Sequence, residues 1–534
     1  MALSSTSTAY KIKDVALWAE PDMLGDSDNA VARGALDLTA DLASRGAASG
    51  WIGHLHSRIV VFDRRLLITT LLGAALFLWP LLVYGRASSF QDSTAYYHAG
   101  RKAVTFVLNK LEPPHVYSSS VPGSPGSQPS AGLSADEQTR QTRGSRSVAY
   151  SVAAYLLGWP QGQMWLLVVA QAVAAGFVCA VGLLLFGENV RGAAAKFAVL
   201  AVATPVAFVA CLLIPDLFAG LSIFIIALIA TAYRSLSPGV RAASVILASA
   251  GIAFHTSHLP LGLGVTAMAA GWLLACERGR RRIGLGQWTA LLAPFLVGAI
   301  ATMSMNSVAF GGASLTGKRY PLTLARSVAE GPAKRYLDKN CGHLRYAICE
   351  IYPHGVPSTV DDFVFGKNGV VERATLEQLD RIRAEEAEVV LAATKAYPLQ
   401  EISRLAYQIT RQLGIFHPGL GLHMRIVMGA DGNPVSVRAS YDPTWARLVA
   451  GLSIVGVLAS LAFLFSRWRT LGELRPMVGL VLFGILLNAA ICVYFSGVSE
   501  RYQARVVWLI PLLGLMALGP IEQRIGAHRG SSPA

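Results

Sequence analysis

Charged side chains are scarce in this chain of 534 residues. Asp, Glu, Lys and Arg together make up 15% of it, whereas hydrophobic residues make up 53%. Because soluble globular domains carry about 25% charged residues, this composition excludes most of them, and the mean hydropathy of +0.46 agrees. We therefore expect an all-α polytopic membrane protein, since a helix satisfies its backbone polar groups within its own segment.

Several familiar motifs are also missing. The chain has no Walker-type phosphate loop, no dinucleotide fingerprint, no HExxH and no GxSxG nucleophile turn. Energy for any reaction would then come from an activated lipid or from none. The net charge of +14 does not indicate nucleic acid, because basic residues between apolar runs are what the positive-inside rule produces. No nucleic-acid partner is expected.

Apolar runs of about 20 residues, the length that crosses a hydrocarbon core about 30 Å thick, recur along the chain. They predict about ten transmembrane helices. Several are short, and 217–233 and 242–254 leave open a broken or re-entrant segment. The still shorter run 147–158 predicts a helix at the interface. The ten runs lie near residues 66–84, 161–186, 195–214, 217–233, 242–254, 259–276, 287–304, 446–466, 477–496 and 506–520.

The connections between these runs are alternately rich and poor in Lys and Arg, and this pattern predicts the orientation of the runs in the membrane. With a cytoplasmic N-terminus, the basic residues fall in the short inside segments, as the positive-inside rule requires, and only Arg501 and Arg505 depart from it. This predicts a multi-pass protein of the cell inner membrane with both termini cytoplasmic. The inside residues are Arg58, Arg64, Arg65, Arg191, Lys196, Arg234, Arg241, Arg278, Arg280, Arg281, Arg282, Arg467, Arg469, Arg475, Arg524 and Arg529.

This topology divides the chain into five parts. The leader shows no cleavable signal, and the first outward loop, 86–146, contains a Ser/Pro/Gly-rich stretch that predicts a mobile connection. The parts are a polar cytoplasmic leader at 1–57, membrane spans at 58–304, an extracytoplasmic loop module at 305–444, the last spans at 445–520 and a cytoplasmic tail at 521–534.

The outward segment 305–444 is long enough for a small folded module. Its stretch VERATLEQLDRIRAEEAEVVLAATKAYP has apolar residues at helical spacing, which predicts an amphipathic helix that ends before Pro398. Of the six cysteines, only Cys341 and Cys349 lie outside in this topology. A disulfide between them is expected in an oxidising compartment, with two free thiols as the alternative.

Ionisable side chains collect at the outward ends of the spans. Such groups are costly at membrane depth and usually pair or serve a cavity, so their convergence on one face favours a site. Structural alternatives stay open: a solvated loop position for Asp92, a helix cap for Asp216 and a turn hydrogen bond for His258. The candidates are Asp92, Asp216, His255, His258, Glu500, Arg501 and Arg505.

Arg501 and Arg505 need a compensating partner on the translocated side. An anionic ligand is one, because guanidinium groups bind phosphate through forked hydrogen bonds, and a lipid phosphate lies at this level of the membrane. The alternatives are an ion pair of Arg501 with Glu500 or Asp92, or anchoring to lipid headgroups.

Together these features resemble the GT-C superfamily of integral-membrane glycosyltransferases. The resemblance is carried by Asp92 with Tyr96 and Tyr97 in the first outward loop, by the interfacial helix that follows, by the many spans and by the late Arg501-Tyr502 pair. It implies a polyprenyl-phosphate-linked sugar as donor, membrane lipids as surroundings and Asp92 as the base at the acceptor. The sequence departs from the commoner paired acids, having Asp-Ser at 92 and 93, so Asp216 is the candidate for a second acid.

In the implied reaction a sugar is transferred to an extracytoplasmic acceptor. Tyr96, Tyr97, Glu500 and Tyr502 would bind substrate, and the arginines would stabilise the departing phosphate with His255 or His258 adding hydrogen bonds. No cofactor is required, although a divalent metal, Mg²⁺ or Mn²⁺, stays open if Asp92 and Asp216 meet. The alternative functions are a lipid or polysaccharide transporter or flippase and, with His258 as base, a membrane acyltransferase.

Overall fold

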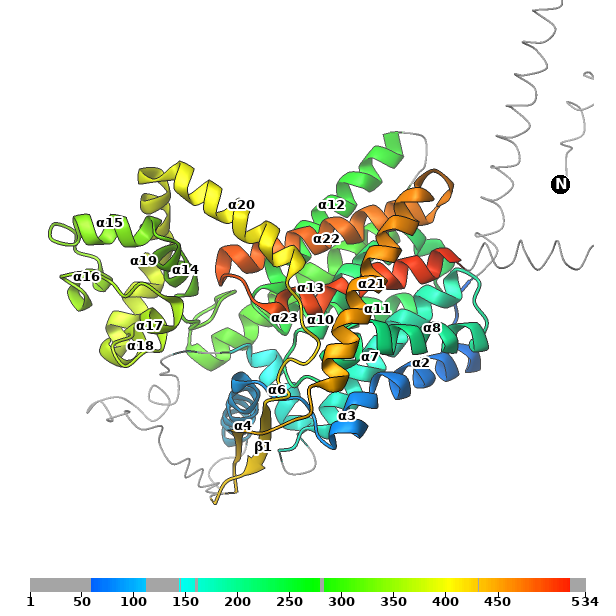
Figure 1. The fold of residues 1–534 in the computed structure, drawn as a ribbon, viewed down its shortest axis with the longest axis horizontal. Helices are drawn as coiled ribbons and strands as arrows, with labels where there is room; N and C mark the ends of the chain where they lie inside the picture. The colour runs from blue at the N-terminus through cyan, green and yellow to red at the C-terminus, as the bar shows by residue number, and fades with distance from the viewer. Residues whose placement is uncertain are drawn as a thin grey trace, which may run out of the picture. The chain divides into compact units, whose positions relative to one another are not determined.

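The computed structural model describes residues 59–111, 144, 146–158, 162–278, 283–430 and 432–518. The predicted leader at 1–57, residues 118–143 of the Ser/Pro/Gly-rich stretch and the tail at 521–534 lie outside the described residues. The described chain is mainly helical, as expected, and Figure 1 shows its long apolar helices side by side in a bundle.

Seven helices of the described part are long and apolar enough to cross a membrane. Except for the one at 217–232, which is almost entirely buried, they present leucine, valine or isoleucine side chains to the outside of the bundle, as a lipid-facing surface requires, because little polar surface is tolerated at this depth. They are α2 (Arg64–Phe77) with α3 (Trp79–Tyr84), α7 (Trp165–Leu185), α10 (Leu217–Ala232), α12 (His258–Arg278), α13 (Leu285–Phe310), α21 (Thr444–Ser466) and α22 (Leu474–Phe495).

Three of the expected spans are shorter or divided. α11 (Pro238–Ala253) has only 16 residues. The run 195–214 is split into α8 (Val190–Ala203) and α9 (Val206–Ala210), because Pro205 has no amide hydrogen and holds the residue before it in an extended conformation. The last run is divided into α23 (Glu500–Val507) and a helical stretch at 509–518. The number of ten crossings therefore stays a prediction.

Short backbone bridges define the two ends of the bundle. Val60 pairs with Leu236 at one end, and Ser88 pairs with Leu212 at the other. We call the second end the site end. The start of α10, the connection between α11 and α12, and α23 meet there, since Asp216, Ser257 and Arg505 are joined by hydrogen bonds.

The first loop contains a long helix that the sequence analysis does not predict. α4 (Gln91–Leu111) packs along α6 (Val148–Leu156), the helix expected near 147–158. A small antiparallel hairpin of β1 (Met424–Met428) and β2 (Pro434–Arg438) lies against α4, and His98 forms a hydrogen bond with the Pro434 carbonyl at 2.9 Å. The hairpin departs from a purely helical fold.

The outward segment forms a helical module with its own core. Leu324, Leu337, Phe363 and Ile382 are among the side chains that build it. The amphipathic helix expected before Pro398 is confirmed as α19, which begins with a capping box at Thr375. The other helices are η1 (Tyr233–Ser235) and η2 (Trp468–Thr470) at span ends and, in the module, α14 (Leu322–Glu330), α15 (Pro332–Asn340), α16 (Ala347–Ile351), α17 (Val360–Val364), α18 (Val370–Arg373), α19 (Leu376–Ala396) and α20 (Pro398–Gly414).

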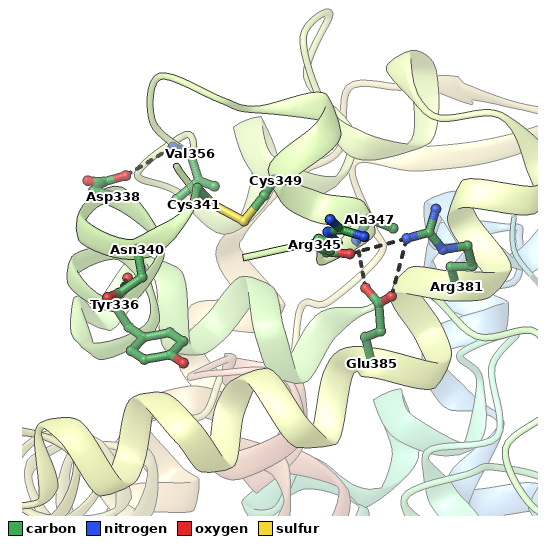
Figure 2. Close-up of a disulfide and its surroundings, with 10 residues drawn as sticks. All are labelled: Tyr336, Asp338, Asn340, Cys341, Arg345, Ala347, Cys349, Val356, Arg381 and Glu385. Atoms are coloured by element: carbon green, nitrogen blue, oxygen red, sulfur yellow. Dashed lines mark hydrogen bonds and ion pairs between the residues drawn. A yellow bond between two sulfur atoms is a disulfide. The ribbon is translucent and has the colours of Figure 1, made fainter. Parts of the chain in front are cut away.

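A disulfide closes one turn of this module. Cys341 and Cys349 are bonded, with their Cα atoms 5.1 Å apart. Figure 2 shows the disulfide between the end of α15 and α16, where Asp338 accepts a hydrogen bond from the Val356 amide at 3.2 Å. Glu385 of α19 accepts one from the Ala347 amide at 2.8 Å. The disulfide and these hydrogen bonds hold the short helix α16 against α19.

Candidate functional site

A buried ion pair forms the centre of the site end. Asp216, just before α10, is 2% exposed, and Arg505 of α23 is fully buried. Arg505 Nη1 donates to Asp216 Oδ1 at 3.1 Å, and Arg501 Nε lies 3.8 Å from Oδ2. The Asp216 side chain makes no hydrogen bond to the first turn of α10. It is therefore an ion-pair partner rather than a helix cap.

Asn488 supplies the second acceptor for Arg505. Its Oδ1, in the middle of the apolar helix α22, accepts from Arg505 Nε at 3.0 Å and Nη2 at 2.7 Å. Its Nδ2 donates to the Tyr502 carbonyl at 2.7 Å. A buried charge is tolerated only when it is paired and hydrogen-bonded, and these contacts meet both requirements. The sequence analysis missed Asn488, although a lone amide within an apolar span is itself a signal.

Arg501 lies one turn before Arg505 and faces the surface of the site. Its guanidinium stacks 5.1 Å from the Phe90 ring and 5.0 Å from the Tyr502 ring. Within the described residues this guanidinium makes no hydrogen bond, and its side chain is 13% exposed. The carboxylate that Arg501 approaches is that of Asp216, not that of Glu500 or Asp92, the two partners considered as alternatives to an anionic ligand. Arg501 is thus the cation best placed to receive an anion.

Asp92 lies in the first turn of α4 and is paired with Arg146. Arg146 donates a hydrogen bond to Asp92 Oδ1. The Arg146 side chain is 25% exposed and the Asp92 side chain is 21% exposed. The Arg146 guanidinium also lies 5.1 Å from the Tyr320 ring. Sequence reasoning missed Arg146. A basic residue on the predicted outward side, directly before an apolar helix, was the available signal.

Two tyrosines of α4 point in different directions. Tyr96 is buried, with its ring 4.9 Å from that of Tyr150, whose hydroxyl donates to Gln171 at 2.9 Å. Burial raises the pKa of Tyr96, and the charge of Asp92 raises it further, so its hydroxyl stays neutral. Tyr97 packs instead against Tyr155, at 5.4 Å between ring centres. Of these two tyrosines, only Tyr96 lies near the charged side chains of Asp92, Asp216 and Arg501, which we call the charged cluster.

The two histidines are also drawn into this cluster. His255 Nδ1 is 2.8 Å from the Ser257 hydroxyl, which accepts from Arg505 at 3.3 Å. Burial lowers the pKa of His255 well below its usual value, and the neighbouring His258 and Arg505 add to this. His258 is buried, with Nδ1 2.7 Å from the Gly251 carbonyl. This hydrogen bond joins the start of α12 to the last turn of α11.

The remaining candidates differ in exposure. Glu500 is exposed, whereas Tyr502 is buried with its ring against both arginines. A cavity of about 10 Å³ adjoins Arg146, Ser147 and Asn306, which is room for about one water molecule. A larger ligand would have to displace the side chains around it.

The residues do not fit a metal centre. A hard cation bridging two carboxylates needs both of them as free ligands, but Asp92 is paired with Arg146 and Asp216 with Arg505. In the described part of the chain, no three His, Cys, Asp or Glu side chains gather in an arrangement that would hold an ion.

Comparison with family models, with curated proteins and with solved structures finds no match for this chain.

Proposed function

We propose that the protein is a membrane glycosyltransferase that moves a sugar from a polyprenyl-phosphate-linked donor to an acceptor outside the cytoplasm. The observation that carries this is the gathering of Asp92, Asp216, Arg501 and Arg505 at one end of the bundle. The charges of Asp92, Asp216 and Arg501 all act on Tyr96, and Arg505 donates to Asp216. Arg501 also stacks on Phe90, two residues before Asp92. A carboxylate beside a cationic anion-binding face suits the loss of a phosphate leaving group.

Asp92 is the base in this proposal. The acceptor hydroxyl attacks the anomeric carbon, its proton passes to Asp92, and the bond from that carbon to the phosphate oxygen breaks. The electron pair of that bond leaves with the polyprenyl phosphate. Asp92 is partly exposed and so can meet an acceptor, once Arg146 turns aside. Direct displacement inverts the anomeric centre.

Arg501 binds the phosphate of the donor, and Asp216 has a positioning role. Asp216 is buried and paired with Arg505, so it orients the arginines rather than touching substrate. The guanidinium of Arg501, held between two rings, offers its N–H groups to phosphate oxygens. The buried His258, with Nδ1 bound to a carbonyl, does not favour an acyltransferase.

The orientation is part of the same proposal. The site end would face the periplasm, with both termini in the cytoplasm and the chain in the inner membrane. The disulfide of the module supports this, because disulfides persist in oxidising compartments. The module meets the site end through Arg326, which donates to the Tyr494 carbonyl at 3.0 Å.

The test is reconstitution with a labelled polyprenyl-phosphate sugar. We expect sugar transfer by the parent protein, loss of transfer in Asp92→Asn and unchanged melting of that variant. Asp361→Asn, the same change at an exposed aspartate of the module, is the control and should retain activity. Movement of intact lipid without bond cleavage would indicate a transporter instead, and full activity in Asp92→Asn would remove the assigned base.

A further inference from the structure

Helix α20 of the module carries an unpartnered apolar face. Leu399 is 82% exposed, Ile402 63% and Leu413 37%, and Ala406 between them is also exposed. These four residues, which we call the apolar stripe, are spaced by three, four and seven positions and so lie on one face of the helix. A water-soluble module would bury such a face.

The neighbouring face of α20 is fixed to the ends of two spans. Gln412 is buried, donates to the Ser499 carbonyl at 2.9 Å and accepts from the Ser499 amide at the same distance. Glu401 accepts from Arg326 at 2.8 Å, and Arg326 donates to the Tyr494 carbonyl in the last turn of α22. Both anchors join α20 to the junction of α22 and α23, which Figure 1 shows beside it.

This attachment places α20 at the level where the spans leave the bilayer. The adjoining surface of α22 exposes Tyr494 by 38% and Leu486 by 49%, so apolar surface continues from the span towards the helix. An aromatic residue such as Tyr494 is typical of the membrane interface. The apolar stripe therefore extends a lipid-facing surface that the bundle already has.

The charges of α20 also suit a membrane surface. Its sequence PLQEISRLAYQITRQLG contains one acid, Glu401, which is buried in the ion pair with Arg326. The exposed charges of the helix are Arg404 and Arg411, both positive. An interfacial helix combines an apolar face in the acyl boundary with basic residues that attract anionic headgroups.

We propose that α20 lies in the outer interface of the bilayer, with the apolar stripe among the acyl chains and its arginines facing anionic lipid headgroups. The module would thus rest on the membrane rather than project freely from it. This inference does not depend on the proposed chemistry of Asp92. Its occupant is the lipid surface, and a second copy of the chain is the rival that the experiment must separate.

The test is site-directed spin labelling of the full chain in nanodiscs that contain anionic lipid. The background is Cys276→Ser, because the other free cysteines, Cys179, Cys211 and Cys492, are buried. Labels at Ile402→Cys and Leu413→Cys should be more accessible to oxygen than to a water-soluble nickel chelate. Labels at Arg404→Cys and Arg411→Cys should show the reverse order, and Leu399→Cys provides another stripe position.

Two results would overturn the proposal. If every labelled position is more accessible to the nickel chelate than to oxygen, the helix lies in water. Dipolar broadening between labels of different chains, lost on dilution with unlabelled protein, would assign the stripe to a dimer contact. Because only surface side chains are changed, an unaltered elution profile shows that each labelled protein is folded.

Discussion

Arg505 donates a hydrogen bond to Asp216 over 3.1 Å, although 289 positions separate the two residues in the chain. This pair connects the start of α10 to α23 inside the bundle, with almost no access to solvent. Arg501, one turn away on the same helix, is left at the surface of the site. The buried arginine thus has a structural partner, whereas the outer arginine keeps 13% of its side chain exposed.

Removing the charge of Asp216 should destabilise the protein. Asp216→Asn keeps the shape of the side chain but leaves Arg505 buried without a counter-ion, and breaking such a pair costs about 3–5 kcal/mol. Unfolding in detergent micelles measures the loss. Glu500→Gln, at an exposed position of the same region, should shift stability by no more than about 0.5 kcal/mol. If Asp216→Asn has the same unfolding free energy as the parent protein, the ion pair does not stabilise the fold.

The contact between the module and the bundle should depend on Arg326. This buried side chain donates to Glu330 and Glu401, each at 2.8 Å, and to the Tyr494 carbonyl. Arg326→Leu leaves two carboxylates without their cation, a loss of about 3–5 kcal/mol. Hydrogen exchange of the backbone amides of α20, residues 398–414, should become faster.

Arg335→Leu is the matched control for this change. Arg335 is exposed and makes one hydrogen bond to Gln400 at 3.2 Å, so its removal should leave exchange in α20 nearly unaltered. Equal exchange rates in both variants would show that the Arg326 contacts do not hold the helix.

The Cys341–Cys349 disulfide should stabilise the module. Closing a loop of this length restricts the unfolded chain by about 2.5 kcal/mol. Cys341→Ser should lower the unfolding free energy of the module by that order, and a reductant should reproduce the effect in the parent while leaving the variant unchanged. Cys276→Ser removes a free cysteine and serves as control. A parent protein indifferent to reductant would contradict the prediction.

His255 should make stability depend on pH. Its pKa in the folded protein is lowered by burial and by the neighbouring His258, Arg505, Arg501 and Arg146. Below about pH 6.5 the unfolded chain therefore binds a proton that the folded chain does not. The free energy of unfolding then decreases as the pH is lowered, by up to about 1.4 kcal/mol per pH unit. Unfolding measured from pH 7 down to pH 5 should show this decline.

His255→Gln should flatten this decline, because glutamine does not titrate. His423→Gln, at an exposed histidine, should keep the slope of the parent. A slope unchanged by His255→Gln would mean that another group binds the proton.

Local patterns in the sequence predicted the helices well and their breaks less well. The periodic charges and apolar residues of 371–398, with Thr375 and Gln378 as a capping box, are sufficient for α19. The hairpin at 424–438 and α4 were missed, because their weaker patterns are stabilised by contacts between them, such as that of His98 with the Pro434 carbonyl.

By itself the sequence determined the helical, lipid-compatible class of this protein and the set of polar residues near the ends of its apolar runs, since composition and periodicity are properties of neighbouring positions. Only the tertiary structure decided that Asp216 pairs with Arg505, that Asn488 completes the pair and that Arg146 covers Asp92. Each of these contacts joins distant segments, and the geometry of helix packing, which no local pattern encodes, selects the partners.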